Sequence, residues 1–285
     1  MVKNQIKTVL LLGGLTGILL GIGNLLGGRQ GLLIGLIFAG VINFVSYWWS
    51  DKIVLKMYRA VEADKNQHKE LYSMVEEIRH AAKLPMPKVY IVPGPHPNAF
   101  AFGRSPNKAG VAFTQGILNL LNKSELKGVA AHELSHIKNR DTLISTIAAT
   151  IAGVISYIAM MARWAAIFGM GGRDDRGGGI LELIALAIIA PIMAMIIQFA
   201  ISRSREFLAD ETGAKLIKDP FSLASALEKI EQGVKHAPLR RQGTTEATAH
   251  LFIENPFRGR SMFNMFSTHP TTSARCKRLR SMKNF

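Results

Sequence analysis

The sequence predicts a mainly α-helical, multi-pass membrane protein with an α+β part outside the membrane. The 285 residues have a mean hydropathy of +0.16 although 19% of them are charged, so the apolar residues are expected in blocks. Two pairs of long apolar runs supply these blocks. The polar segments that follow the pairs carry helical patterns and short strand-like runs, which predict the α+β part.

The first pair of apolar runs predicts a transmembrane hairpin. Residues 8–26 and 32–49 carry no charge, reach spanning length and are separated by a short turn that contains Arg29. The second run ends in Tyr47, Trp48 and Trp49, which favour a membrane interface. A cleaved signal peptide is the alternative. The first run is longer than such a peptide requires, and no small-x-small site precedes the turn.

The second pair of apolar runs covers residues 142–162 and 180–201. Pro191 lies inside the latter, where neighbouring helices can satisfy the freed carbonyl, and Glu182 lies near one end, where it can reach the interface. Both runs reach spanning length only with their flanks, so a buried hairpin of a soluble domain remains the alternative.

Basic residues near the ends of the runs predict the orientation. Lys52, Lys56 and Arg59 follow the second run, and Lys138 and Arg140 precede the third, which places both termini and the polar segments in the cytosol. This topology also accounts for the net charge of +15. Nucleic-acid binding is not expected, because no basic motif with interleaved aromatic residues is present.

The polar segments predict helices over residues 51–84, 122–141, 205–217 and 221–234, with Asn122 or Ser124 as the N-cap of the second. The expected strands are Val89–Val92, Asn98–Phe102 and Val111–Phe113. The chain thus divides into a transmembrane hairpin (1–50), the first part of a polar domain (51–141), a second hairpin (142–201) and the second part of the polar domain (202–285).

Residues 132–136 form an H-E-x-x-H motif on the helix expected over residues 122–141. His132 and His136 are four residues apart and therefore lie on one helix face, where both imidazoles can bind one metal ion. Glu133 is placed to exchange a proton with a water at the metal. The alternative is a pair of surface histidines.

A third ligand is expected, because a catalytic zinc takes three protein ligands and one water. Cys276 is the single cysteine, so a cysteine cluster and an intramolecular disulfide are both excluded. Glu206 is the candidate, and Asp210 lies four residues later on the same helical face, where it could hold a ligand imidazole. Surface ion pairs of Glu206 and Asp210 with Arg203 or Arg205 are the alternative.

Several motifs in one order resemble HtpX, a family of bacterial membrane zinc metalloproteases related to the CAAX prenyl endopeptidases. The resemblance covers nearly the whole chain. It implies a zincin-like α+β catalytic domain split by the second hairpin. The motifs are Pro-Asn-Ala-Phe-Ala at residues 97–101, H-E-x-x-H at 132–136, Ser-Arg-Ser-Arg-Glu-Phe-Leu-Ala-Asp at 202–210 and Ser-Thr-His-Pro at 267–270.

The resemblance also implies roles for single residues. One zinc ion would be bound by His132, His136 and Glu206, with Glu133 as general base and acid. Asp210 would support a ligand from behind.

Three further roles follow from the same resemblance. Asn98 and Ala99 belong to the segment that would hold an extended substrate backbone by strand addition. His269 would stabilise the oxyanion, with assistance from Arg275.

The implied function is a zinc endopeptidase that cleaves unfolded or damaged membrane proteins at the cytosolic face of the inner membrane, as part of protein quality control. Its partners would be such substrates and the lipid bilayer. Charged residues around the motif, such as Lys127 and Lys138, disfavour an intramembrane protease. The sequence also leaves open a prenyl-protein protease, a scaffold with structural zinc and a metal transporter. An intact Glu133 argues against the scaffold.

Overall fold

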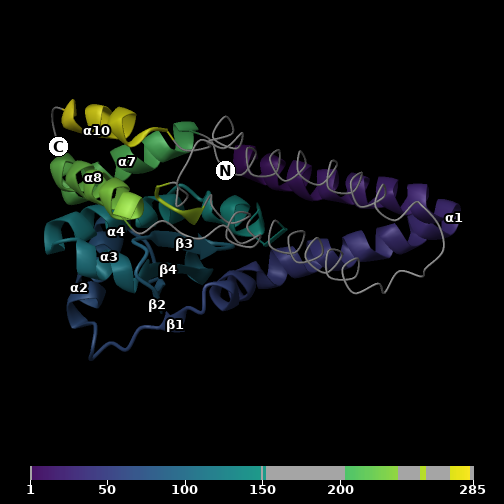
Figure 1. Ribbon diagram of the computed structural model, residues 1–285, viewed down its shortest axis with the longest axis horizontal. Helices are drawn as coiled ribbons and strands as arrows, with labels where there is room; N and C mark the ends of the chain where they lie inside the picture. The colour runs from purple at the N-terminus through teal and green to yellow at the C-terminus, as the bar shows by residue number, and fades with distance from the viewer. Residues whose placement is uncertain (1, 149, 152–202, 237–250, 255–269, 283–285) are drawn as a thin grey trace.

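The computed structural model describes residues 2–148, 150–151, 203–236, 251–254 and 270–282 (Figure 1). Most of these residues are helical, and one small sheet accompanies the helices. The fourth apolar run, most of the third and His269 lie outside the described residues. The labelled elements are α1 (Val2–Met57), β1 (Val61–Glu62), α2 (Lys69–Ala82), β2 (Lys88–Val92), β3 (Ala99–Gly103), the short 3-10 helix η1 (Pro106–Lys108), β4 (Ala109–Thr114), α3 (Gln115–Leu120), α4 (Lys123–Lys138), α7 (Arg203–Ile217), α8 (Pro220–His236) and α10 (Thr272–Arg280).

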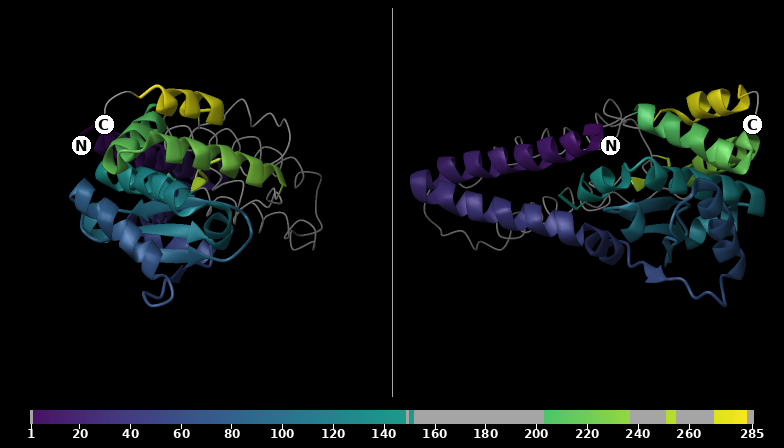
Figure 2. Two further views of the ribbon diagram at one scale, coloured as in Figure 1. Left: turned by 90° about the vertical axis from the view of Figure 1, so that its left-hand side faces the viewer. Right: turned by 180° about the vertical axis from the view of Figure 1, so that it is seen from behind.

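Helix α1 folds back on itself, and its two limbs project side by side from the rest of the chain (Figures 1 and 2). Gly28 has a φ of +53°, a left-handed conformation that glycine adopts without strain. Asn43 of the second limb donates to Oγ1 of Thr16 in the first over 2.8 Å. A Cβ at Gly35 would come within 2.6 Å of the carbonyl oxygen of Leu19, so the limbs touch backbone to backbone.

Within the described residues, the segment Gly28–Met57 is the one helix long and apolar enough to cross a membrane. The first limb contributes a shorter apolar stretch, Leu12–Gly21. Leu15 of this limb packs against Ile144, Ile147 and Ile151, so the hairpin is fixed to the helical residues that follow the H-E-x-x-H helix.

The sheet has the strand order β1-β2-β4-β3, with β2 and β4 parallel and the other pairs antiparallel. The three predicted strands are present as β2, β3 and β4. Strand β3 lies at the edge and pairs with β4 in the register Ala101 opposite Val111. At the last residue of β3, Thr142 donates to the carbonyl oxygen of Gly103, and Thr146 accepts from the N–H of the same residue.

Helix α4 lies between the sheet and the helices α7, α8 and α10 (Figure 2). Asn122 caps it, and the predicted N-cap becomes a full capping box with Glu125. Two glycines permit close helix packing. A Cβ at Gly128 would lie 2.9 Å from the backbone of Leu223 on α8, and one at Gly213 on α7 would lie 2.9 Å from the backbone nitrogen of His132.

The continuous helix expected over residues 51–84 is wrong. Helix α1 ends at Met57, and α2 begins only at Lys69. Arg59 takes a positive φ of 51°, and the N–H of Ala63 donates to the carbonyl oxygen of Val89 over 2.9 Å. Pairing with the sheet edge therefore overrides the local helical preference of this stretch.

Candidate metal centre

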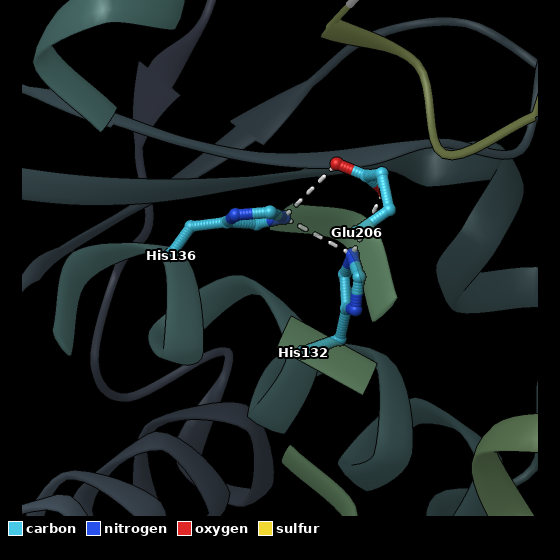
Figure 3. A group of neighbouring side chains, drawn as sticks. All are labelled: His132, His136 and Glu206. Carbon is cyan, nitrogen blue, oxygen red and sulfur yellow. Dashed lines mark hydrogen bonds and ion pairs between the residues drawn. The ribbon is translucent and has the colours of Figure 1, made fainter. Parts of the chain in front are cut away.

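Three side chains from two helices meet at one point (Figure 3). His132 and His136 extend from α4, and Glu206 extends from α7. The Nε2 atoms of the two histidines are 3.1 Å apart, and each lies 3.7 Å from a carboxylate oxygen of Glu206. A tetrahedral zinc site with ligands at about 2.05 Å separates its ligand atoms by about 3.3 Å. The donor set and its spacing therefore fit a single zinc-sized ion.

Each imidazole is held from behind by a carboxylate. Oδ1 of Asp210 lies 2.9 Å from Nδ1 of His132, and both carboxylate oxygens of Asp141 lie 3.2 Å from Nδ1 of His136. A carboxylate at Nδ1 orients the ring, keeps the proton on that nitrogen and directs the Nε2 lone pair at the centre. Both histidines are therefore arranged as metal ligands before any ion binds.

A buried arginine completes the support behind His132. Nε and Nη2 of Arg275 donate to the two oxygens of Asp210 over 2.8 and 2.7 Å, and its Nη1 donates to the carbonyl oxygen of Ile253 over 3.2 Å. Burial alone would raise the pKa of Asp210, but Arg275 and then His132 lower that pKa to about 2. Asp210 therefore stays ionised. The structure pairs Arg275 with Asp210, and the assistance to His269 that the family resemblance implies stays a prediction, because His269 lies outside the described residues.

Glu133 is buried beside the two histidines. Its Oε2 accepts the backbone N–H of Ala101, on the edge strand β3, over 2.7 Å. Burial raises the pKa of Glu133, and the neighbouring histidines oppose that rise only in part. A carboxyl group with a raised pKa can both accept and return a proton near neutral pH.

The pKa of His136 is raised above the ordinary value of a histidine. Burial lowers the pKa of this imidazole, but Asp141 and then Glu206 outweigh burial and raise the pKa to about 10. The proton on Nε2 has to leave before that nitrogen can bind a metal, so metal binding at this site releases a proton.

A small cavity of about 50 Å³ opens onto the three converging side chains. One wall is apolar and comes from β3 and from residues 251–253, while the other is polar and comes from α4, α7 and the residues after α4. The lining residues are Phe100, Ala101, His132, Glu133, His136, Asp141, Thr142, Ser145, Arg205, Glu206, Leu251, Phe252 and Ile253.

The structure gives Asn98 a contact within the chain. Its side-chain Nδ2 donates to the carbonyl oxygen of Leu251 over 3.2 Å, and its Oδ1 accepts the N–H of Ile253 over 3.0 Å. Asn98 therefore fixes the segment that forms the apolar wall of the cavity. Asn98 and Ala99 are both buried in the chain without substrate. Their contact with substrate stays a prediction.

The sequence predicts the three metal ligands, Glu133 and Asp210 as residues of one site. Two further residues of this site, Asp141 and Arg205, are not predicted from the sequence. The sequence-based prediction gives Asp141 no role, whereas its carboxylate lies 3.2 Å from Nδ1 of His136. Asp141 follows the helix end, where Arg140 adopts a φ of 57° and turns the chain back toward His136. Arg205 was considered only as a surface ion-pair partner of Glu206 and Asp210, whereas it lines the cavity.

Comparison with known proteins gives the family. The model of peptidase family M48 matches residues 65–283. Proteins named Protease HtpX homolog from Desulforapulum autotrophicum and Thermococcus kodakarensis are 55% and 54% identical, over 97% of this chain and over 89% and 95% of their own lengths.

The fold has a solved counterpart as well. The crystal structure of S. mikatae Ste24p matches with a TM-score of 0.53 at 15% identity, over 97% of this chain and 64% of that one. Likeness at this identity concerns the fold alone. The family match and the whole-length relatives together show that this chain belongs to peptidase family M48, among the HtpX homologues.

Proposed function

We propose that this chain is a membrane-bound zinc endopeptidase whose active site is the His132, His136 and Glu206 centre with Glu133. The observation that carries the proposal is the convergence of three ligand atoms at the spacing of a tetrahedral ion, next to a buried carboxyl group that does not itself belong to the ligand set. A structural zinc site would be closed by a fourth protein ligand and would not require such a group.

Zinc fits the donor set of two imidazoles and one carboxylate. An ion held there would supply Lewis acidity, which lowers the pKa of a water and polarises the scissile carbonyl. Membership in a metallopeptidase family implies a metal, and the choice of zinc rests on the ligand types.

The chain's own residues move the proton. Because the Ala101 N–H holds Oε2 of Glu133, Oε1 is the atom we expect to take the proton of the attacking water and to transfer it to the leaving nitrogen. Asp210 and Asp141 keep the two rings in place during this cycle. His269 is proposed to stabilise the oxyanion, as the HtpX motif implies.

The hairpin of α1 is proposed to anchor the enzyme in a bilayer. Four large apolar residues on one face of its second limb, Ile34, Ile37, Val41 and Phe44, are between 54% and 68% exposed. The aromatic residues at positions 47–49 follow and then a basic segment, the order expected at a cytosolic membrane interface. A second hairpin within residues 142–201 and a cytosolic catalytic domain are part of the same proposal.

Unfolded or damaged membrane proteins are the proposed substrates, in a quality-control role. An edge strand beside the site suits an extended backbone, which unfolded chains provide and folded proteins do not. Strand β3 is such an edge, and its residue Ala101 lines the cavity.

The test compares wild type with Glu133→Gln, both purified in detergent and assayed for bound zinc and for casein cleavage. We expect one zinc ion per chain in both proteins and cleavage by wild type only. Glu125→Gln is the matched control, because this carboxyl group lies on the same helix but contacts α8, and it should leave cleavage intact. Bound zinc without cleavage by wild type would favour the scaffold, and absence of zinc from both proteins would contradict the ligand assignment.

A further inference from the structure

Arg205 has an unusual position in the wall of the active-site cavity. It precedes the candidate ligand Glu206 on α7, and it lines the same cavity as Ala101 and Glu133. Its Nη1 and Nη2 atoms are closed off from solvent, and neither has a hydrogen-bond partner among the residues that the structure describes. Arg275, the fully buried arginine of the site, instead has its donors engaged by Asp210 and Ile253.

Two buried guanidinium nitrogens without hydrogen-bond partners are costly to maintain. A buried donor without an acceptor costs about 1–3 kcal/mol, and a charged one more. Burial lowers the pKa of Arg205, and Asp141 and Glu206, which line the same cavity, oppose that effect. Neither carboxylate accepts a hydrogen bond from Nη1 or Nη2 of Arg205. Asp141 is directed at His136, and Glu206 faces the two Nε2 atoms.

The chemistry of the missing partner follows from the guanidinium itself. Arginine has only donors, arranged in a planar fork, and therefore binds oxygen acceptors such as carbonyls and carboxylates. Arg205 lines a cavity that also contains the three candidate metal ligands, so an acceptor that reaches its guanidinium from this cavity would belong to a molecule bound at the reaction centre.

We propose that Arg205 is a substrate-binding residue that holds an oxygen acceptor of the polypeptide close to the scissile bond. This proposal rests on the proposed peptidase function. The acceptor has two possible sources, a main-chain carbonyl or the carboxylate of an acidic side chain. A main-chain carbonyl would make Arg205 a general positioning group, and an acidic side chain would make it a determinant of cleavage specificity.

The experiment uses the full-length enzyme with Arg205→Gln and Arg205→Lys, and with Arg203→Gln as the matched control. Arg203 lies two residues earlier on α7 and is exposed, so its replacement removes the same charge outside the cavity. The substrates are peptides that differ only in carrying Ala, Gln or Glu on either side of the cleaved bond. Bound zinc and melting temperature are measured for each variant.

We expect Arg205→Gln to lower kcat/KM by about 10-fold or more, as for loss of a charged hydrogen bond, with zinc content unchanged. Arg205→Lys should recover part of the loss, and Arg203→Gln should match wild type. An equal loss on all peptides identifies the main-chain carbonyl, and a loss confined to the Glu peptides identifies the acidic side chain. Unchanged kinetics on every peptide, or a loss explained by missing zinc, would overturn the proposal.

A binding measurement separates this proposal from the proposed function. A fluorescent peptide is titrated onto Glu133→Gln protein with and without Arg205→Gln, where no turnover is needed. Weaker peptide binding by the double variant would support the Arg205 site, whether or not wild type cleaves the peptide. Absence of cleavage by wild type would count against the peptidase function alone. Equal binding by both proteins would count against the Arg205 site.

Discussion

The backbone N–H of Ala101 donates to Oε2 of Glu133 over 2.7 Å, which joins the edge strand of the sheet to the proposed general base. Two residues further along β3, the backbone groups of Gly103 are also bonded away from the sheet. Its N–H donates to Oγ1 of Thr146, and its carbonyl oxygen accepts from Oγ1 of Thr142. The outer edge of β3 is therefore closed at its Gly103 end. Under the proposed function, an added substrate strand would extend toward Ala99, where Asn98 holds residues 251–253.

The carboxylate behind His136 is expected to set metal affinity. Asp141→Asn keeps the shape of the side chain but weakens the acceptor at Nδ1, so the ring is held less firmly. Loss of such support typically costs about 10–100-fold in metal affinity. The affinity is measured by titrating zinc-loaded protein with a competing chelator.

Glu211→Gln serves as the control for this measurement. Glu211 follows Asp210 but points outward to Lys215 and Arg278, in exposed ion pairs that contribute little. Equal zinc affinity in Asp141→Asn and wild type would show that Asp141 does not support the ligand.

Arg275 is expected to stabilise the folded chain strongly. Arg275→Met removes the partner of Asp210 and leaves that carboxylate buried without compensation. Removal of one partner of a buried ion pair lowers the free energy of unfolding by about 3–5 kcal/mol. This loss should appear as a large fall in melting temperature. Arg278→Met is the control, since Arg278 is about half exposed and should change stability little. A melting temperature close to wild type for Arg275→Met would contradict this account.

Gly213 is expected to set the distance between the two helices of the site. In Gly213→Ala the new Cβ would lie 2.9 Å from the backbone nitrogen of His132, so α7 has to move away from α4 and carry Glu206 with it. We expect a loss of about 1–3 kcal/mol in the free energy of unfolding together with weaker zinc binding.

Gly233→Ala provides a matched comparison for this prediction. The nearest atoms to its Cβ belong to the side chains of Leu120 and Pro97, at 3.0 and 3.1 Å, so a small adjustment relieves the contact. If both variants lost stability equally and neither lost zinc, close approach at Gly213 would not be what holds Glu206 in place.

Patterns local in sequence predicted most of this fold. The apolar spacing on α4, α7 and α8 and the short apolar runs of β2, β3 and β4 are strong enough to locate these elements within a few residues. The same helical spacing identifies the histidine pair. Spacing alone could not decide whether Glu206 pairs with a metal or with a surface arginine, and the packing of α7 on α4 favours the first.

The remaining features depend on contacts between distant or turning segments. Ala63 pairs with Val89 across the sheet, which no local pattern indicates, so the helix expected over residues 51–84 is interrupted. Asp141 reaches His136 only because Arg140 turns the chain at the helix end. Arg275 meets Asp210 across 65 residues of sequence, a distance over which one sequence carries no pairing signal.

The buried Glu125 makes the stability of the α4 cap depend on pH. Burial raises the pKa of this carboxyl group, but Lys229, Ser225 and the backbone of Asn122 together hold the pKa below its ordinary value. A lowered pKa in the folded state contributes stability that is present above the pKa of the unfolded chain, about 4.3, and is lost as the pH falls through the folded value.

Comparison of wild type with Glu125→Gln across the pH range tests this dependence. Lys229 is partly exposed, which reduces its contribution, so we expect wild type to be more stable by about 1–2 kcal/mol at pH 7. The difference should shrink below about pH 4, where the Glu125 carboxylate becomes protonated. It is measured from thermal unfolding of both proteins in the same detergent. A difference that stays constant down to pH 3 would mean that hydrogen-bond geometry and not the charge of Glu125 stabilises the cap.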